Sequence, residues 1–157
     1  MVIQIDTREK ARAIKSIVAH FDRNGIGHIS SKLYCGDYMN LDNPKIIVDR
    51  KQNLLEVTQN VCQQHKRFTD EIKRAKAVGI KLIFLVEHGY GIESLEDVKE
   101  WHNPRLSESP MAVSGERLYK IMATMQSHFG IEWVFCDKRN TGAKIVELLG
   151  CDSNGTE

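Results

Sequence analysis

Two aspartates and a lysine are spaced so that their side chains could meet at one end of a β-hairpin. Asp37 belongs to the first predicted strand, and Asp49 and Lys51 close the second strand after the apolar run Ile46-Ile47-Val48. Two carboxylates can hold a divalent cation, and a neighbouring ammonium can act on the attacking water or on phosphate charge. Side chains of these types in this pattern are typical of a metal-dependent nuclease, with Mg²⁺ or Mn²⁺ as the expected cofactor.

The predicted register of the hairpin brings the two carboxylates together. If Asp42-Asn43-Pro44 is a three-residue turn, Leu41 pairs with Lys45, and Asp37 then lies opposite Asp49. Directly opposed residues share a face, with Cβ atoms ~4.5–5.5 Å apart. Two like charges this close repel each other, and a bound cation relieves the repulsion. The alternative is an ordinary surface hairpin, but a continuously apolar strand is usually buried on both faces.

The N-terminal segment supplies two further carboxylates, Asp6 and Glu9. They follow a predicted strand, Val2–Ile5, and precede a predicted helix over 11–24 that ends at an Asn-Gly pair. The two residues could form a capping box at the start of that helix, which is a structural role. They could instead join the hairpin aspartates around the metal, and one residue could do both.

Three motifs occur in order along the first part of the chain: Ile5-Asp6-Thr7-Arg8-Glu9, Gly36-Asp37-Tyr38 and Val48-Asp49-Arg50-Lys51. Together they resemble the XPF/Hef-type (ERCC4-domain) structure-specific nucleases of the PD-(D/E)XK superfamily. The resemblance implies an α/β fold with a restriction-endonuclease-like core, in which helices flank a central mixed β-sheet. It also implies divalent-metal-dependent hydrolysis of DNA phosphodiesters, at branched, flap or fork structures.

By this resemblance, the residues expected to be catalytic are Asp6, Glu9, Asp37, Asp49 and Lys51, and the expected metal ligands are Asp6, Asp37 and Asp49. The side chains expected to contact DNA are Arg8, Arg50, Arg67, Lys73 and Arg105. Arg67 and Glu71 resemble an arginine and a polar residue, four positions apart, that the family has near its site. The basic face of this helix could follow phosphates, or it could be a solvated face with acidic residues interleaved.

The chain departs from the family pattern at two positions. Asp49 stands where the family has Glu, and the superfamily accepts either acid. Leu55 stands where the family's last Asp would be, with Glu56 next to it. Because a shift of one residue turns a side chain by ~100° on a helix, Glu56 replaces that Asp only if the helix starts differently.

The rest of the chain predicts further α/β structure. The predicted elements are a long helix over 52–77, a buried strand over 82–86, a short helix over 93–101, an irregular segment over 102–114, a helix over 115–129, a strand over 131–136 and a helix over 141–149 capped by Thr141. Residues 1–150 would form one ERCC4-type nuclease domain, and 151–157 a polar tail that we expect to be disordered.

Composition limits the possible partners. The net charge is only +1 at pH 7, so any DNA-binding surface must be local. The four cysteines form no Cys-x-x-Cys pair, which argues against a zinc module or a disulfide framework. The sequence has no apolar run of membrane length and no signal peptide, so we expect an intracellular protein with no membrane partner.

Two other functions remain open at this stage. The chain could be a catalytically inactive DNA-binding or scaffold subunit, although inactive family members lose the acids and the lysine that are present here. It could also be a Holliday-junction-resolvase-like PD-(D/E)XK enzyme. We further expect a homodimer, because the resemblance implies that such nuclease domains pair. The apolar residues Met111, Val113, Met122 and Met125 also exceed what one short helix need bury. The competing interpretation is that they cover the second face of the sheet.

Overall fold

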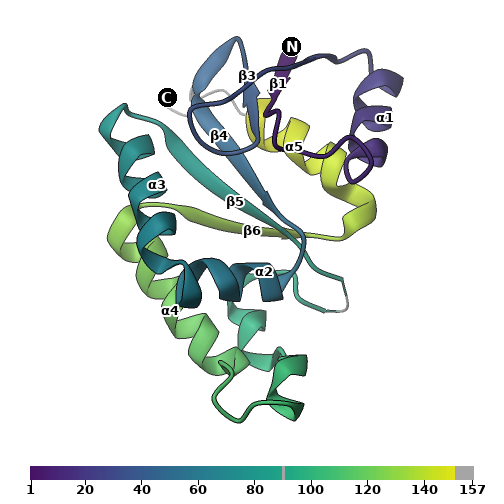
Figure 1. Ribbon diagram of the computed structural model, residues 1–157. Helices are drawn as coiled ribbons and strands as arrows, with labels where there is room; N and C mark the ends of the chain where they lie inside the picture. The colour runs from purple at the N-terminus through teal and green to yellow at the C-terminus, as the bar shows by residue number, and fades with distance from the viewer. Residues whose placement is uncertain (90, 151–157) are drawn as a thin grey trace, which may run out of the picture.

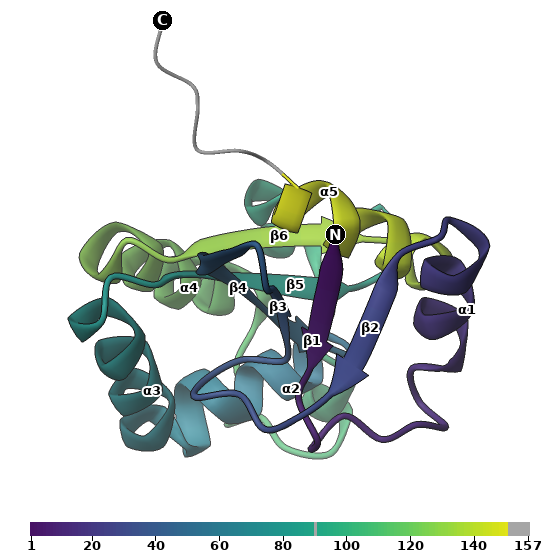
Figure 2. The same ribbon diagram turned by 90° about the horizontal axis from the view of Figure 1, so that it is seen from above.

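The computed structural model describes residues 1–89 and 91–150, so the predicted tail at 151–157 lies outside the described residues. Its strands are β1 (Val2–Ile5), β2 (Gly27–Ser30), β3 (Tyr38–Asn40), β4 (Asn43–Lys51), β5 (Lys81–Glu87) and β6 (Glu132–Cys136). They form one sheet in the order β2-β1-β3-β4-β5-β6. Helices lie against both faces of this sheet (Figure 1, Figure 2), which confirms the predicted α/β fold.

The helical elements are of three kinds. The α-helices are α1 (Lys15–Arg23), α2 (Leu54–Thr58), α3 (His65–Ala77), α4 (Gly115–Phe129) and α5 (Thr141–Gly150). A π-helical turn, η1 (Gln59–Gln63), connects α2 to α3. The 3₁₀ turns are η2 (Leu95–Glu100), η3 (Pro104–Ser107) and η4 (Lys138–Asn140).

The sheet is mixed, and β4 lies near its centre. β4 runs antiparallel to β3 and parallel to β5, which in turn is parallel to β6. The last five residues of β4, from Ile47 to Lys51, are all buried. This confirms the burial expected from the apolar run, and it carries Asp49, Arg50 and Lys51 into the interior at the end of the strand.

One face of the sheet is covered by α2, α3 and α4. Phe68 of α3 packs on Phe84 of β5, with ring centroids 4.9 Å apart, and Phe84 packs on Trp133 of β6 at 4.8 Å. The same core contains three of the four residues on which the dimer prediction rested, Val113, Met122 and Met125. Because the chain's own sheet covers these side chains, they give no support to a dimer, and only Met111 stays exposed.

The opposite face is covered by α1 and α5, the first and last α-helices. Ile17 and Phe21 of α1 share a core with Ile145 and Leu149 of α5. The side-chain amide of Asn40, in β3, donates a hydrogen bond of 3.3 Å to the carbonyl of Leu149. The C-terminal helix therefore completes a core that the N-terminal part of the chain begins.

The hairpin of β3 and β4 has the predicted register but not the predicted turn. Tyr38 pairs with Val48 and Met39 with Ile47, so one further step along the strands brings Asp37 level with Asp49. The three-residue turn is wrong, because a β-bulge after Met39 shifts the register so that Asn40 pairs with Asn43. The bulge absorbs the shorter turn and leaves the pairing near the two aspartates unchanged.

Several predicted helices differ in extent. The helix expected to start near residue 11 starts at Lys15, and the helix expected over 52–77 is divided into α2, η1 and α3. The helix expected over 93–101 is the 3₁₀ turn η2. Thr141 is the first residue of α5 rather than its cap, and its hydroxyl donates to the carbonyl of Lys138 at 3.1 Å.

Candidate active site

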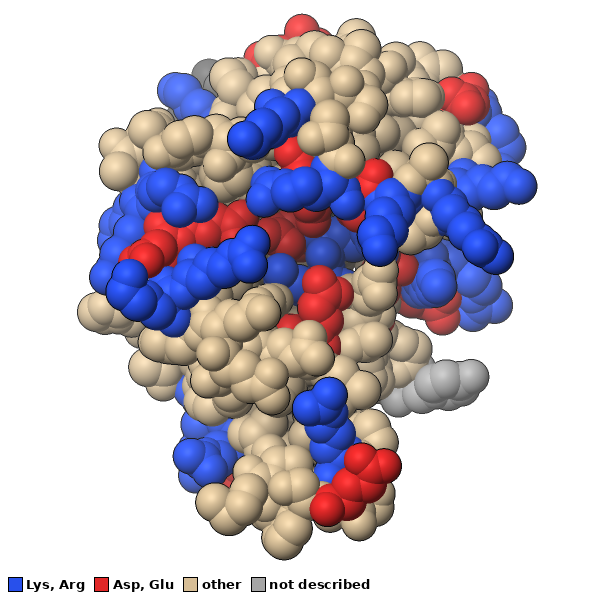
Figure 3. Space-filling view, viewed as in Figure 1, with Lys and Arg blue, Asp and Glu red and all other residues tan. Residues whose placement is uncertain are grey.

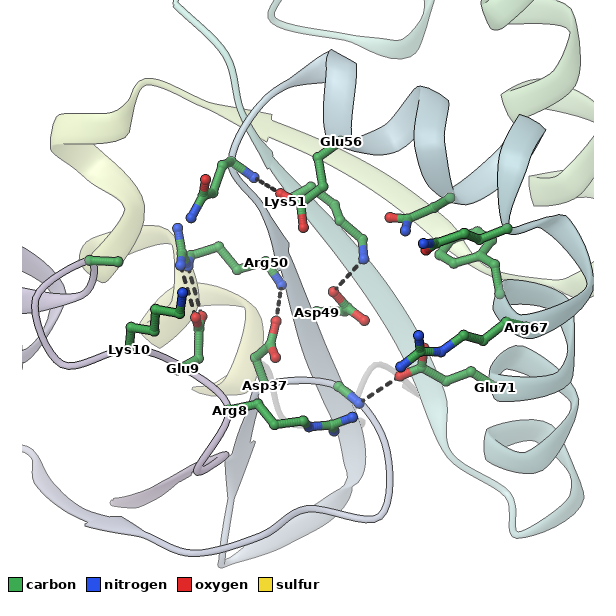
Figure 4. Close-up of a pocket in the computed structure, with 16 residues that line it drawn as sticks. Arg8, Glu9, Lys10, Asp37, Asp49, Arg50, Lys51, Glu56, Arg67 and Glu71 are labelled. Atoms are coloured by element: carbon green, nitrogen blue, oxygen red, sulfur yellow. Dashed lines mark hydrogen bonds and ion pairs between the residues drawn. The ribbon is translucent and has the colours of Figure 1, made fainter.

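The predicted catalytic residues of the hairpin line one pocket of about 360 Å³. Its walls come from the N-terminal segment 8–13, from the end of β4 and from the helical run α2–η1–α3. Figure 3 shows acidic side chains inside a hollow on this face, with lysine and arginine side chains along its rim. The C-terminal end of β4 delivers Asp49 and Lys51 to this pocket, and Asp37 enters from the position just before β3 (Figure 4).

Asp37 is held by the backbone of β4. Its amide donates to the carbonyl of Val48 at 2.9 Å, and its Oδ2 accepts a hydrogen bond of 2.8 Å from the amide of Arg50. Burial raises the pKa of Asp37 well above its ordinary value, and the charges of Asp49 and Glu9 raise it further. Folding therefore opposes ionisation of this carboxyl. A buried carboxylate that lacks its bound cation is expected to behave in this way.

Lys51 lies in a largely apolar setting beside Asp49. Its Nζ is 3.1 Å from Oδ1 of Asp49 and lies over the rings of Phe68 and Phe84, 5.4 and 5.6 Å from their centroids. Burial lowers the pKa of Lys51, but the charge and hydrogen bond of Asp49 more than offset this, so that the pKa is raised. Lys51 is therefore a fixed positive charge at the pocket and not a proton acceptor.

Asp6 lies outside this pocket. Its Oδ1 accepts a hydrogen bond of 2.8 Å from the amide of Leu33, and its Oδ2 accepts bonds from the amide and Nε of Arg8 at 3.1 and 2.6 Å. The capping-box interpretation is wrong, because the helix begins at Lys15. Although burial raises the pKa of Asp6, the bonds to Arg8 and Leu33 lower it by more. Asp6 thus ties the N-terminal segment to the loop before β3.

The structure makes Asp6 a stabilising residue, and this can be measured. In Asp6→Ala, the buried amide of Leu33 loses its acceptor, and we expect the free energy of unfolding to fall by ~1–3 kcal/mol. Because the pKa is lowered in the folded state, this stabilisation exists at neutral pH and is lost as the pH falls through that pKa. Urea titrations of Asp6→Ala and of Asp6→Asn, which keeps an acceptor oxygen, measure the effect. Unchanged stability, with activity restored by excess Mn²⁺, would return Asp6 to the metal site.

Arg50 is buried in an ion-pair network instead of facing DNA. Its Nε and Nη2 donate to the two carboxylate oxygens of Glu9 at 2.7 and 2.8 Å, and its Nη1 donates to Oε1 of Glu87 at 2.5 Å. Its side chain is only 5% exposed. The predicted DNA contact of Arg50 is at odds with this placement. Glu9, predicted to be catalytic, lines the pocket with its carboxylate committed to Arg50.

The other predicted DNA-binding residues separate into two groups. Arg8 and Arg67 line the pocket and extend toward each other from opposite walls (Figure 4). The side chain of Arg8 is 59% exposed, so its guanidinium is accessible at the rim. Lys73 is exposed on α3 without lining this pocket, and Arg105 lines a second pocket.

Two acidic residues at the site, Glu71 and Glu56, were considered from the family pattern but were not assigned a catalytic, metal-binding or DNA-binding role. Glu71, on α3, accepts a hydrogen bond of 3.1 Å from the amide of Gly36 and so holds the backbone next to Asp37. Its position one helical turn after Arg67 was the available signal. Glu56 lines the pocket as well, and its Oε2 accepts a hydrogen bond of 2.7 Å from the amide of Gln52.

A divalent cation fits the donor chemistry of the hairpin carboxylates. Asp37 and Asp49 offer hard oxygen ligands, and the raised pKa of Asp37 reflects charge that a cation would neutralise. Within residues 1–89 and 91–150, no three His, Cys, Asp or Glu side chains are grouped closely enough to hold a metal by themselves. Mg²⁺ suits such a site, because it is commonly bound by one or two carboxylates and completes its shell with water and phosphate oxygens.

The chain was compared with protein families and with known proteins. The family model of the ERCC4 domain matches residues 5–149. The chain belongs to the ERCC4 domain family. No curated protein sequence matches it. Among its described residues, no helix has both the length and the apolar composition needed to cross a bilayer.

The solved structures that match this chain include two of an XPF protein. XPF from Aeropyrum pernix has 22% sequence identity and a TM-score of 0.67, and the match covers 95% of this chain and 63% of that chain. XPF from Aeropyrum pernix in complex with DNA has 21% identity and a TM-score of 0.66, with the same coverage. At this identity the similarity establishes the fold, and the chain spans less than two thirds of those proteins.

Proposed function

We propose that this ERCC4 domain is a divalent-metal-dependent endonuclease that hydrolyses DNA phosphodiesters. The observation that carries the proposal is the convergence of Asp37, Asp49 and Lys51 at one pocket. In this proposal Asp37 and Asp49 hold Mg²⁺ or Mn²⁺, and Lys51 stabilises negative charge on the attacking water or on the phosphate. The retained acids and lysine favour an active enzyme over a catalytically inactive scaffold subunit.

The residues around Asp37, Asp49 and Lys51 would orient these side chains and bind the substrate phosphates. When bound, the cation supplies Lewis-acid activation of the phosphate and lowers the pKa of a water molecule. Arg50 fixes the orientation of Asp37 through its backbone amide, and Glu71 fixes the preceding residue. Arg8 and Arg67 lie on opposite walls of the pocket, where they would hold the phosphates on either side of the bond to be cut.

The proposed substrates are branched, flap or fork DNAs, or other junctions of single and double strands. One solved relative, XPF from Aeropyrum pernix, was crystallised with DNA. A nuclease acting on cellular DNA would be intracellular, as the sequence predicts. A homodimer remains a prediction. Light scattering tests it directly, because a monomer has a mass of 17.9 kDa and a dimer has twice that mass.

A substrate panel tests the proposed activity. End-labelled flap, fork, four-way junction and duplex DNAs of the same sequence should be incubated with the protein and Mg²⁺, Mn²⁺ or EDTA. We expect cleavage near the branch point of flap or fork DNA with either metal and none with EDTA. Binding to these DNAs without cleavage under any metal condition would support the scaffold alternative. Selective, symmetric cutting of the four-way junction would support a resolvase-like enzyme.

A further inference from the structure

We call the pocket lined by Asp37, Asp49 and Lys51 the active pocket. A second pocket lies on the far side of α2 and η1 from it. Glu56, Asn60 and Gln64 line the active pocket, whereas Thr58, Cys62 and Gln63 from the same helical run line the second one. Its opposite wall is formed by the segment 103–113 and the first turns of α4. In Figure 1, α2 lies between the sheet and this lower part of the molecule. We call this pocket, of about 360 Å³, the arginine groove.

The arginine groove is positively charged and has an apolar lining. Arg105 and Arg117 line it together with the apolar side chains of Met111, Val113 and Ile121, and no acidic residue within 1–89 and 91–150 lines it. Among the described residues, neither guanidinium forms an ion pair. Arg117 lies in the first turn of α4, where the helix dipole also favours an anion. Burial raises the pKa of the Cys62 thiol, and the charge of Arg117 partly offsets this.

The wall that carries Arg105 is held in place by a fully buried polar side chain. Asn103 is 0% exposed; its Oδ1 accepts from the amide of Arg105 at 3.0 Å, and its Nδ2 donates to the carbonyl of Val113 at 2.9 Å. These bonds fix two lining residues that are eight positions apart. Met111, between them, is 88% exposed, so its apolar side chain is accessible at the groove. The groove is therefore built into the fold and offers an apolar contact to a ligand.

We infer that the arginine groove binds a single-stranded arm of the DNA whose scissile phosphate lies in the active pocket. This inference rests on the proposed nuclease function. Two unpaired arginines would bind phosphates, and the apolar lining would contact bases, which a duplex keeps stacked inside its helix. An α-helix with its side chains is ~10–12 Å wide, so about three nucleotides at the ~3.4 Å spacing of stacked DNA would pass across α2 from one pocket to the other.

Protection of Cys62 from alkylation tests this inference without requiring cleavage. Of the three cysteines among the described residues, Cys62 is exposed and lines the groove, whereas Cys35 is buried and Cys136 is half-buried. Maleimide modification of the intact protein should be followed by mass spectrometry with an oligothymidine and with a blunt duplex, and Cys62→Ser identifies the reporting thiol. We expect the oligothymidine to slow modification of Cys62 at least fivefold and the duplex to leave it unchanged. Equal protection by both DNAs, or by neither, would overturn the inference.

A double variant tests the two arginines. In Arg105→Gln with Arg117→Gln, we expect the Kd for the oligothymidine to rise about tenfold. Its dependence on salt should become shallower by about 1.4, which corresponds to two lost phosphate contacts on a single strand. The matched control is Arg23→Gln, an exposed arginine on α1 that lines neither pocket. An unchanged Kd in the double variant, or the same loss with Arg23→Gln, would contradict a specific groove.

Failure of this inference can be told apart from failure of the proposed nuclease. If the wild-type protein cuts fork DNA and the double variant retains the same Kd for every DNA, the groove is rejected and the nuclease stands. If the wild-type protein cuts no DNA but the oligothymidine still protects Cys62, the nuclease is rejected and the single-strand site stands. On fork DNA, a longer single-stranded arm should lower KM for the wild-type protein but not for the double variant. The value of kcat should be the same in both proteins, because the residues proposed to be catalytic are untouched.

Discussion

The Asp37→Asn protein should be folded, more stable than the wild type without metal, and at least ~10²–10³-fold slower in DNA cleavage. Activity falls because a neutral amide replaces one of the two carboxylates proposed to hold the cation. Stability rises because the wild-type carboxyl is destabilised by burial and by the charges of Asp49 and Glu9, as its raised pKa shows. Asparagine removes this charge and keeps an oxygen that can accept from the amide of Arg50.

The pH dependence of stability provides a second measurement on the same variant. An acid whose pKa is raised by folding binds more protons in the folded state than in the unfolded state. In metal-free protein, the free energy of unfolding should therefore decrease as the pH rises from about 3.8, the ordinary value for Asp, through the raised pKa of Asp37. This decrease should be smaller in Asp37→Asn. The matched control is Asp42→Asn, an exposed residue in the turn of the same hairpin. Wild-type cleavage rates in Asp37→Asn with metal present would overturn the assignment.

The largest loss of stability is expected for Arg50→Met. This change removes the cation that pairs with Glu9 and Glu87 and leaves two largely buried carboxylates without it. Breaking a buried pair in this way typically costs ~3–5 kcal/mol. Urea titration measures the loss, and Arg23→Met is the control, because Arg23 is exposed on α1 and its removal should cost far less. If Arg50→Met weakens DNA binding while its stability equals that of the wild type, the DNA contact predicted from the sequence is right and the network is not.

The sequence predicted the relative placement of the two hairpin aspartates and the lysine well, because that geometry is local. Asp49 and Lys51 lie on β4 and Asp37 directly precedes β3, so alternation along β4 with a hairpin register is enough to bring them together. The partners of Asp6 and Arg50 could not be predicted in this way. Leu33 lies 27 positions from Asp6, and Glu87 lies 37 positions from Arg50. Such pairings depend on the order of the strands in the sheet. The sequence around Asp6 or Arg50 does not specify that order.

The elements that the sequence did not predict are those with a weak local pattern. β4 and β5 were recognisable from long apolar runs, whereas β2 has only four residues, Gly27–Ser30, and none of them is buried. The π-helical turn η1 interrupts a predicted long helix at Gln59–Gln63, where the sequence has no proline or glycine to mark it. The division of that helix bears on both proposals, because its two sides line the pocket of Asp37, Asp49 and Lys51 and the arginine groove.

The place of α5 has a consequence for how the chain folds while it is being made. Ile3 and Phe21 are synthesised early, but the core that buries them also needs Ile145 and Leu149, which belong to the last helix. Ribosomes add ~5–20 residues per second, so these early apolar side chains wait for several seconds without their final partners. During synthesis, aggregation is therefore most favoured while only the N-terminal half has been made. A chaperone that shields β1 and α1 would reduce this aggregation only until α5 has emerged.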